Sequence, residues 1–161
     1  MDVLIMDLGG NIPGECNLTD YTKKIEILSF SHGVAMQITG DVSNTVRTSG
    51  KPNHQDFTVT KYMDAASPLL NQACCKGDNL PQVKLIVARN DSGKVLPFMT
   101  YTLKNVVISS VSIGGGSGDK PVETVTLNYA QIDWVYTSQK QELGDGGQVN
   151  GKWDLAKNAA A

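Results

Sequence analysis

The sequence predicts a mostly β protein, a closed or nearly closed β-barrel of short antiparallel strands or a sandwich, with one short α-helix at about residues 67–76. Short runs rich in β-branched and aromatic residues recur along the 161-residue chain, separated by Gly, Pro, Asn and Asp. Only one segment combines helical spacing with signals for a helix end. We expect a single domain over residues 1–161, because this length fits one core and no shift in composition marks a boundary.

The N-terminal half contains four predicted strands and one long loop. Gly33 separates the second strand from the third and is expected to form a bend or a bulge. Residues 40–55 are polar and turn-rich, which predicts a long extended loop that is functional or ordered by a partner. The strands are predicted at residues 3–8, 24–32, 34–39 and 56–62.

The helix is predicted by the run SPLLNQACCKG. Ser67 is a good N-cap, and Pro68 suits the first helical position. The apolar residues that follow recur at helical spacing, and Gly77 can end the helix in the left-handed conformation.

The C-terminal half is again predicted to be mostly strand. The turn sequence NDSGK, residues 90–94, predicts a hairpin, and the break GGGSGDKP separates two later strands. Residues 138–161 are expected to form a short Gly- and Ala-rich C-terminal tail, with Trp153 as its anchor. The strands are predicted at residues 82–89, 96–104, 105–113, 122–130 and 132–139.

The charge balance gives no electrostatic reason to expect nucleic acid or an anionic membrane as a partner. There are 14 Lys and Arg against 16 Asp and Glu, for a net charge of −2. The N-terminus lacks the basic and apolar regions of a signal peptide, and no run reaches the length of a membrane helix, so synthesis and assembly are expected in the cytosol. Three cysteines in that compartment predict no disulfide framework.

The adjacent thiols Cys74 and Cys75 are not expected to carry chemistry. There is no C-x-x-C motif, and Cys16 with two distant histidines is poor spacing for zinc. Adjacent helical residues point about 100° apart, so at most one thiol faces the core as a small apolar residue.

No catalytic, cofactor-binding or metal-binding residue is predicted. His32 lies at a strand end and His54 in the polar loop, and no nucleophile motif accompanies them. The glycines at 114–116 lack the spacing of a phosphate-binding loop. Trp134 is expected to pack in the barrel, and the acidic residues are scattered without forming an acid–base pair.

Two long segments resemble the hemolysin co-regulated protein (Hcp) family of type VI secretion systems. FTVTKYMDAASPLLNQACCKG, residues 57–77, is similar to the family's strand, TKY-x-D-x-x-S-P-x-L and helix pattern. SSVSIGGGSGDKPVETVTLNYAQIDWVY, residues 109–136, is similar to its second, longer pattern. The resemblance spans roughly residues 3–153, and the cysteine pair is not part of it.

The resemblance implies a structural role. Family members form hexameric rings that stack into a tube, are exported without a signal peptide, and carry effector proteins in the lumen; a spike protein and a contractile sheath are the further partners. This predicts a tube subunit rather than an enzyme, assembled in the cytoplasm and then secreted. The alternative is a stand-alone β-barrel module that binds a small ligand or carbohydrate.

Two sets of residues are candidates for assembly and cargo contacts. In strand 24–32, Leu28 and Phe30 are expected in the core, which turns Ser29 and Ser31 toward the lumen and its effectors, although the isoleucines at 25 and 27 share the serine face. The loop at 40–55 is expected to mediate ring stacking, with three charged candidates: Asp41, Arg47 and Lys51.

Overall fold

The computed structural model describes residues 2–38, 49–139 and 145–161 of the chain. These residues form one helix, α1 (Ser67–Lys76), and eleven strands. The strands are β1 (Asp2–Asp7), β2 (Ile25–Glu26), β3 (Ser29–Ser31), β4 (Val34–Ile38), β5 (Ser49–His54), β6 (Phe57–Tyr62), β7 (Asn79–Asp91), β8 (Lys94–Gly114), β9 (Val122–Asn128), β10 (Gln131–Gln139) and β11 (Asp145–Asp154).

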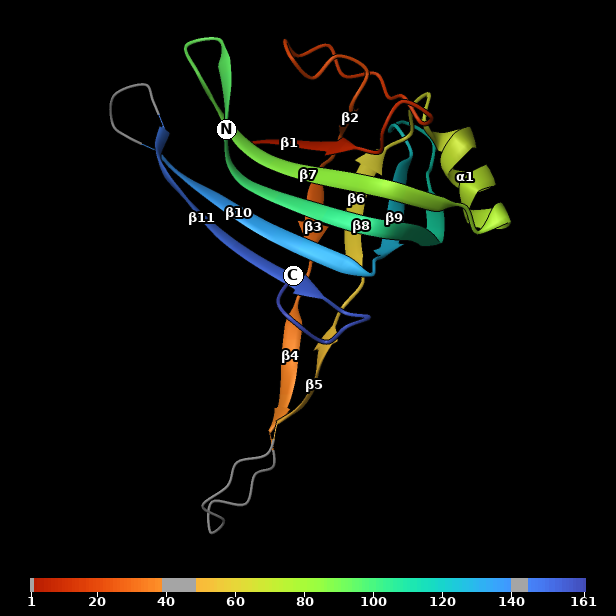
Figure 1. Cartoon of the computed structure of the whole chain (residues 1–161). Helices are drawn as coiled ribbons and strands as arrows, with labels where there is room; N and C mark the ends of the chain where they lie inside the picture. Colours follow the sequence, from red (N-terminus) through yellow and green to blue (C-terminus); the bar gives the residue numbers. More distant parts are fainter. Residues whose placement is uncertain (1, 39–48, 140–144) are drawn as a thin grey trace.

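Most strands belong to one antiparallel sheet that curves into a nearly closed barrel (Figure 1). Its order is β2-β1-β7-β8-β9-β6-β3, and β10 pairs with both β8 and β11. The long strand β8 serves two parts of the sheet, because residues 99–104 pair with β10 and residues 107–114 pair with β9. The two runs predicted as separate strands at 96–104 and 105–113 are therefore one continuous strand. The predicted hairpin at 90–94 is confirmed by the pairing of β7 with β8.

The segment that was predicted as one strand at 24–32 links the two ends of this sheet. The Ile27 N–H donates to the Leu4 carbonyl of β1 at 3.1 Å, and the Leu28 N–H donates to the Thr60 carbonyl of β6 at 2.7 Å. The chain changes its pairing partner between these two residues. One predicted strand is thus two short ones, β2 on β1 and β3 on β6.

The change of partner also shifts which side chains face inward. Ile25 and Ile27 are buried, although regular alternation placed them on the outer serine face. Leu28 was expected in the core, but its side chain is 46% exposed, so that prediction is wrong. Phe30 does pack against the core, as expected. Strict period-two alternation fails here because the strand is interrupted at residue 28.

A single apolar cluster fills the barrel and continues under α1. Phe57 and Val59 of β6 face Val125 and Leu127 of β9 through the strand register, and all four are fully buried. Leu70 of the helix is also fully buried. Burial of this kind is the main term that stabilises the body of the molecule.

Helix α1 has the predicted range but not the predicted N-cap. Ala66 occupies the N-cap position without a side-chain hydrogen bond, and Ser67 lies inside the first turn. Gly77 adopts φ +66°, which confirms the predicted left-handed C-cap. In the described parts of the chain, no helix has the length and apolar character needed to cross a membrane.

Strands β4 and β5 form a separate two-stranded sheet, here called the ribbon (residues 34–38 and 49–54). It extends away from the barrel at the bottom of Figure 1. The prediction of a long loop at 40–55 is wrong for residues 49–54, which form a strand of the ribbon. The candidates Asp41 and Arg47 lie outside the described residues, whereas Lys51 is exposed on β5.

The C-terminal segment predicted as a tail contains strand β11, which lies along β10 (Figure 1). Trp153 pairs in register with Ile132 and packs against the core, which confirms it as an anchor. Trp134 packs against the same core, as expected.

Candidate functional site

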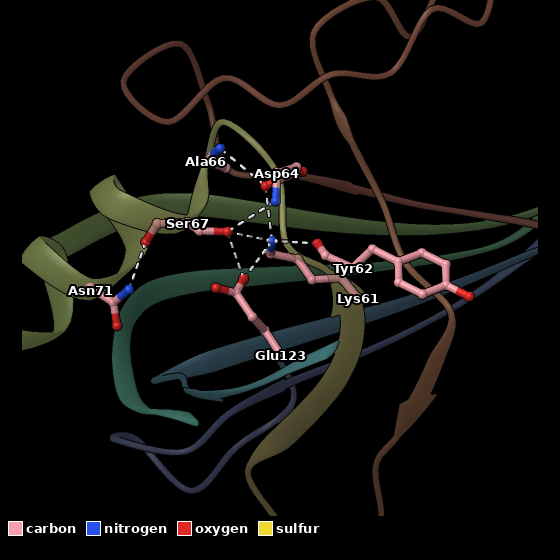
Figure 2. A network of polar contacts seen from close by, with 7 residues as sticks. All are labelled: Lys61, Tyr62, Asp64, Ala66, Ser67, Asn71 and Glu123. Atoms are coloured by element: carbon pink, nitrogen blue, oxygen red, sulfur yellow. Dashed lines mark hydrogen bonds and ion pairs between the residues drawn. The ribbon is translucent and has the colours of Figure 1, made fainter. Parts of the chain in front are cut away.

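A buried ion cluster lies where the start of α1 meets the barrel wall (Figure 2). Alternation along β6 places Lys61 on the same inward face as Phe57 and Val59, and its register partner on β9 is Glu123. The side chains of Lys61 and Glu123 are both 0% exposed, and their charged atoms Nζ and Oε2 are 2.7 Å apart. A lysine and a glutamate therefore occupy two positions of the core.

Asp64 and Ser67 complete this cluster. Lys61 Nζ donates to Asp64 Oδ1 at 2.9 Å and to Ser67 Oγ at 3.3 Å, while Ser67 Oγ donates to Glu123 Oε2 at 2.8 Å. Asp64 Oδ1 also accepts the Ala66 N–H at 3.0 Å, at the beginning of α1 (Figure 2). The cluster ties three elements together: β6, the first turn of α1 and β9.

The geometry favours a structural role for the cluster. Ser67 Oγ lies near a lysine amine, a pair that can act in hydrolases, but both side chains are buried and the serine proton already binds a carboxylate. A substrate would have no access to the hydroxyl. The ion pair instead fixes the position of α1 on the barrel.

A second feature is a surface of serine and threonine hydroxyls on the outer face of the barrel, here called the hydroxyl face. The predicted lumen residues Ser29 and Ser31 are exposed at one side of it. The register of β3, β6, β9 and the end of β8 adds six more hydroxyls to form two cross-strand rows. One row is Ser29, Thr60, Thr124 and Ser112; the other is Ser31, Thr58, Thr126 and Ser110.

The hydroxyl face carries no charge among its eight members, and all of them are exposed or half-buried. The hydroxyls of Ser29 and Thr60 bind each other, so neighbouring strands are already linked within a row. Each hydroxyl both donates and accepts hydrogen bonds. The arrangement offers an uncharged surface that can bond to many different polar partners.

The third feature is a histidine pair at the root of the ribbon. His32 and His54, which are 22 positions apart in the chain, lie with ring centroids 6.5 Å apart, and the Nδ1 atom of each contacts the Tyr129 hydroxyl. Burial lowers the pKa of both imidazoles. Within the described ranges, no group of three or more His, Cys, Asp or Glu side chains is arranged to hold a metal ion.

The cysteines are separate from all three features. Cys75 is exposed and Cys74 is half-buried against the core, which confirms that at most one of the two thiols faces inward. Cys16 is buried, and burial raises the pKa of its thiol. All three are free thiols.

Comparison with known proteins identifies the family. The sequence profile of the family described as "Type VI secretion system effector, Hcp" matches residues 5–136. Protein hcp1 of Pseudomonas aeruginosa is 35% identical over 154 residues, which cover 94% of each chain.

Solved structures of type VI secretion proteins have the same fold as this chain. One described as a type six secretion system protein superposes with a TM-score of 0.93 at 29% identity, covering 100% of both chains. Hcp1 from Salmonella typhimurium has a similar fold, with a TM-score of 0.82 at 23% identity over 99% of both chains. The two sequence segments that resembled this family and the barrel that they form lead to one conclusion: the chain belongs to the Hcp family of type VI secretion proteins.

Proposed function

We propose that this chain is a structural subunit of the type VI secretion tube, that it forms hexameric rings which stack through the ribbon, and that it carries effector proteins against the hydroxyl face. Family membership places it among structural secretion proteins. The observation that carries the proposal is the ribbon, an exposed two-stranded element with apolar side chains and no core of its own.

The ribbon has the composition of a docking element. Val34, Met36 and Ile38 alternate along β4, so they share one face of the strand, and they are 48%, 44% and 57% exposed. An isolated two-stranded sheet is only marginally stable in water. Contact with a neighbouring ring would bury the apolar stripe and supply the missing stabilisation. Lys51 is available at the same element for a charged contact.

The hydroxyl face supports the role in carrying effectors. Ser29 and Ser31 were proposed as lumen residues, and they belong to a surface of eight hydroxyls rather than to an isolated pair. A ring that presents this face inward would have a wall without charged side chains along β3, β6 and β9. Such a wall binds different cargo weakly and lets it pass.

The remaining parts of the proposal follow the family resemblance. Residues 1–161 act as one domain, rings assemble in the cytoplasm and leave through the type VI machine, and the spike protein and contractile sheath are the other partners. No chemical step belongs to this role.

The proposal is tested by the mass of the purified protein and by electron microscopy. A hexamer mass and ring-shaped particles are the expected result, and a monomer at all concentrations would contradict it. For cargo, Ser31→Gln adds bulk to the hydroxyl face without adding charge. We expect rings to persist while retention of at least one co-purifying effector falls; unchanged retention of every effector would remove this face from the cargo contact.

A further inference from the structure

The histidine pair joins the ribbon to the barrel. His32 directly precedes the turn into β4, and His54 ends β5, so one imidazole lies at the root of each strand. Between them the Gln55 N–H donates to the Gly33 carbonyl at 2.9 Å. Any change in the position of the two rings therefore changes how the ribbon leaves the barrel.

Both rings pack on aromatic side chains of the barrel. The His32 ring stacks on Phe57 of β6 with 5.2 Å between centroids, and the His54 ring stacks on Trp134 of β10 at 6.3 Å. Tyr129, from the connection between β9 and β10, contacts both imidazoles edge-on. The ribbon root is thus seated on residues from three separate barrel segments.

The Tyr129 hydroxyl contacts both imidazoles and one backbone carbonyl. Its oxygen lies 3.1 Å from the Gln55 carbonyl, to which it donates, and 3.2 and 3.4 Å from Nδ1 of His32 and His54. A hydroxyl has only one proton, so with that proton on the Gln55 carbonyl the Tyr129 oxygen accepts from both Nδ1 atoms. In the tautomer that fits this arrangement, each neutral imidazole carries its proton on Nδ1 and none on Nε2.

The two Nε2 atoms are buried and have no hydrogen-bond partner among the described residues. A proton added there creates an N–H⁺ group without an acceptor, and a second proton places two positive charges at neighbouring rings. Each added proton is therefore more stable if the ring moves toward water, which would break the contact with Tyr129.

The nearest carboxylate is that of Asp56, which precedes β6 and accepts hydrogen bonds from Ser109 and Asn128. Its charge acts on Tyr129, whereas burial is the main cause of the lowered pKa at both histidines. The phenols in contact with the His32 ring are Tyr101 of β8 and Tyr129 of the β9–β10 connection, and burial raises the pKa of each, so both stay neutral. Strand β8 also carries Lys94 and Lys104.

Strands β6, β10 and β5 each carry one charged residue, and that of β6 is Lys61, which is paired with Glu123. On β10, Asp133 accepts a hydrogen bond from Gln131. On β5, Lys51 is exposed. On β4, the residues Val34–Ile38 carry no charge.

We propose that His32, His54 and Tyr129 form a proton-sensitive clasp that holds the ribbon in a fixed direction when both imidazoles are neutral and releases it when they are protonated. The clasp is independent of ring stacking, but its consequence for tubes rests on the proposed function. The direction of the pKa shifts agrees with this clasp, because burial lowers the pKa of both histidines. At His32, the hydrogen bond to the Gln55 backbone raises the pKa and the charge of His54 lowers it further. Stabilisation by the clasp is thus complete above about pH 6.5, the ordinary histidine value, and is lost as the pH falls below it.

Hydrogen exchange tests the clasp at low protein concentration, where no tubes form. Amides of β4 and β5 are compared with those of β6 and β9 at pH 7.5 and 5.5, after correction for the intrinsic exchange rate. We expect ribbon protection to fall about tenfold or more at the lower pH, with little change in the barrel, because the released imidazoles bind protons more tightly than the buried ones. Equal protection at both values would overturn the proposal.

A matched variant and a second measurement exclude other causes. The double variant His32→Asn with His54→Asn removes both titrating groups, so its ribbon should exchange equally at both pH values; the same acid response as the parent would overturn the clasp. Nitrogen NMR of the parent at pH 8 should find both imidazoles protonated on Nδ1, and a proton on Nε2 of either ring would contradict the geometry. Because neither measurement requires stacking, failure of the tube proposal leaves this test intact.

Discussion

The barrel and the ribbon are built from the same kind of antiparallel strand but are stabilised in opposite ways. In β6, the alternate side chains Phe57, Val59 and Lys61 are fully buried, including the charged amine of the lysine. In β4, every residue from Val34 to Ile38 is exposed. The barrel is therefore stabilised by its own core, whereas the ribbon depends on the contacts at its root and on whatever covers its apolar stripe.

The largest effect on folding is expected from breaking the buried ion pair of the barrel. Lys61→Met leaves Glu123 charged and without its main partner in the core, which costs about 3–5 kcal/mol of unfolding free energy. The double variant Lys61→Met with Glu123→Leu replaces both charges with apolar groups and should recover most of the loss. Urea unfolding measures the unfolding free energy of the single and the double variant. Equal losses in the single and double variants would show that the pair is not the source of the effect.

A smaller loss is expected at the serine that links α1 to this pair. Ser67→Ala removes the donor to Glu123 and an acceptor for Lys61, which costs about 1–3 kcal/mol because both partners are buried. Asn71→Ala is the matched control, since it removes only one bond, to the Ser67 carbonyl, from an exposed side chain of the same helix. The two variants are compared by urea unfolding, and a control that destabilises as much as Ser67→Ala would contradict the account of the cluster.

Substitutions in the ribbon should change the assembly of tubes rather than the stability of the folded subunit. Met36→Ser removes the centre of the apolar stripe and should change the unfolding free energy by no more than about 0.5 kcal/mol, since the side chain lies outside the core. Tubes, scored by electron microscopy, should be lost. Gln37→Ser, on the opposite face of β4, should keep them. Tubes of normal length from the Met36 variant would show that the stripe is not a docking surface.

The smallest effect is expected at the exposed thiol of the helix. Cys75→Ser should change the unfolding free energy by about 0.5 kcal/mol or less and leave export intact, because Cys75 lies on the solvent side of α1. Secretion assays and thermal unfolding check this. Loss of secretion with intact rings would give Cys75 a function that the structure does not suggest.

Local signals in the sequence predicted most elements of the barrel. The helix range, its glycine C-cap and the hairpin at 90–94 each depend on a few neighbouring residues, and the structure confirms them. Position 28 was predicted wrongly because its environment depends on which strand the chain pairs with next. The polar composition of residues 49–54 predicts a loop, but their register with β4 makes them a strand.

The candidate sites were harder to predict than the fold. Alternation along β6 and β9 could have revealed Lys61 and Glu123 as inward-facing, since each shares its face with buried apolar residues. The hydroxyl face was only partly anticipated through Ser29 and Ser31, because the other six hydroxyls join it through strand register. The histidine pair had no local signal at all: its members meet only when both ends of the ribbon return to the barrel.

The most direct test of the difference between barrel and ribbon is to remove the ribbon. Gly33 and Gln55 are joined by a backbone hydrogen bond of 2.9 Å, so a short Gly- and Asn-containing turn can replace residues 34–54 without opening the barrel. The shortened protein is then examined by mass in solution and by electron microscopy. We expect folded hexameric rings that form no tubes. Tubes of normal length, or a chain that no longer folds, would contradict a self-sufficient barrel carrying a separate stacking element.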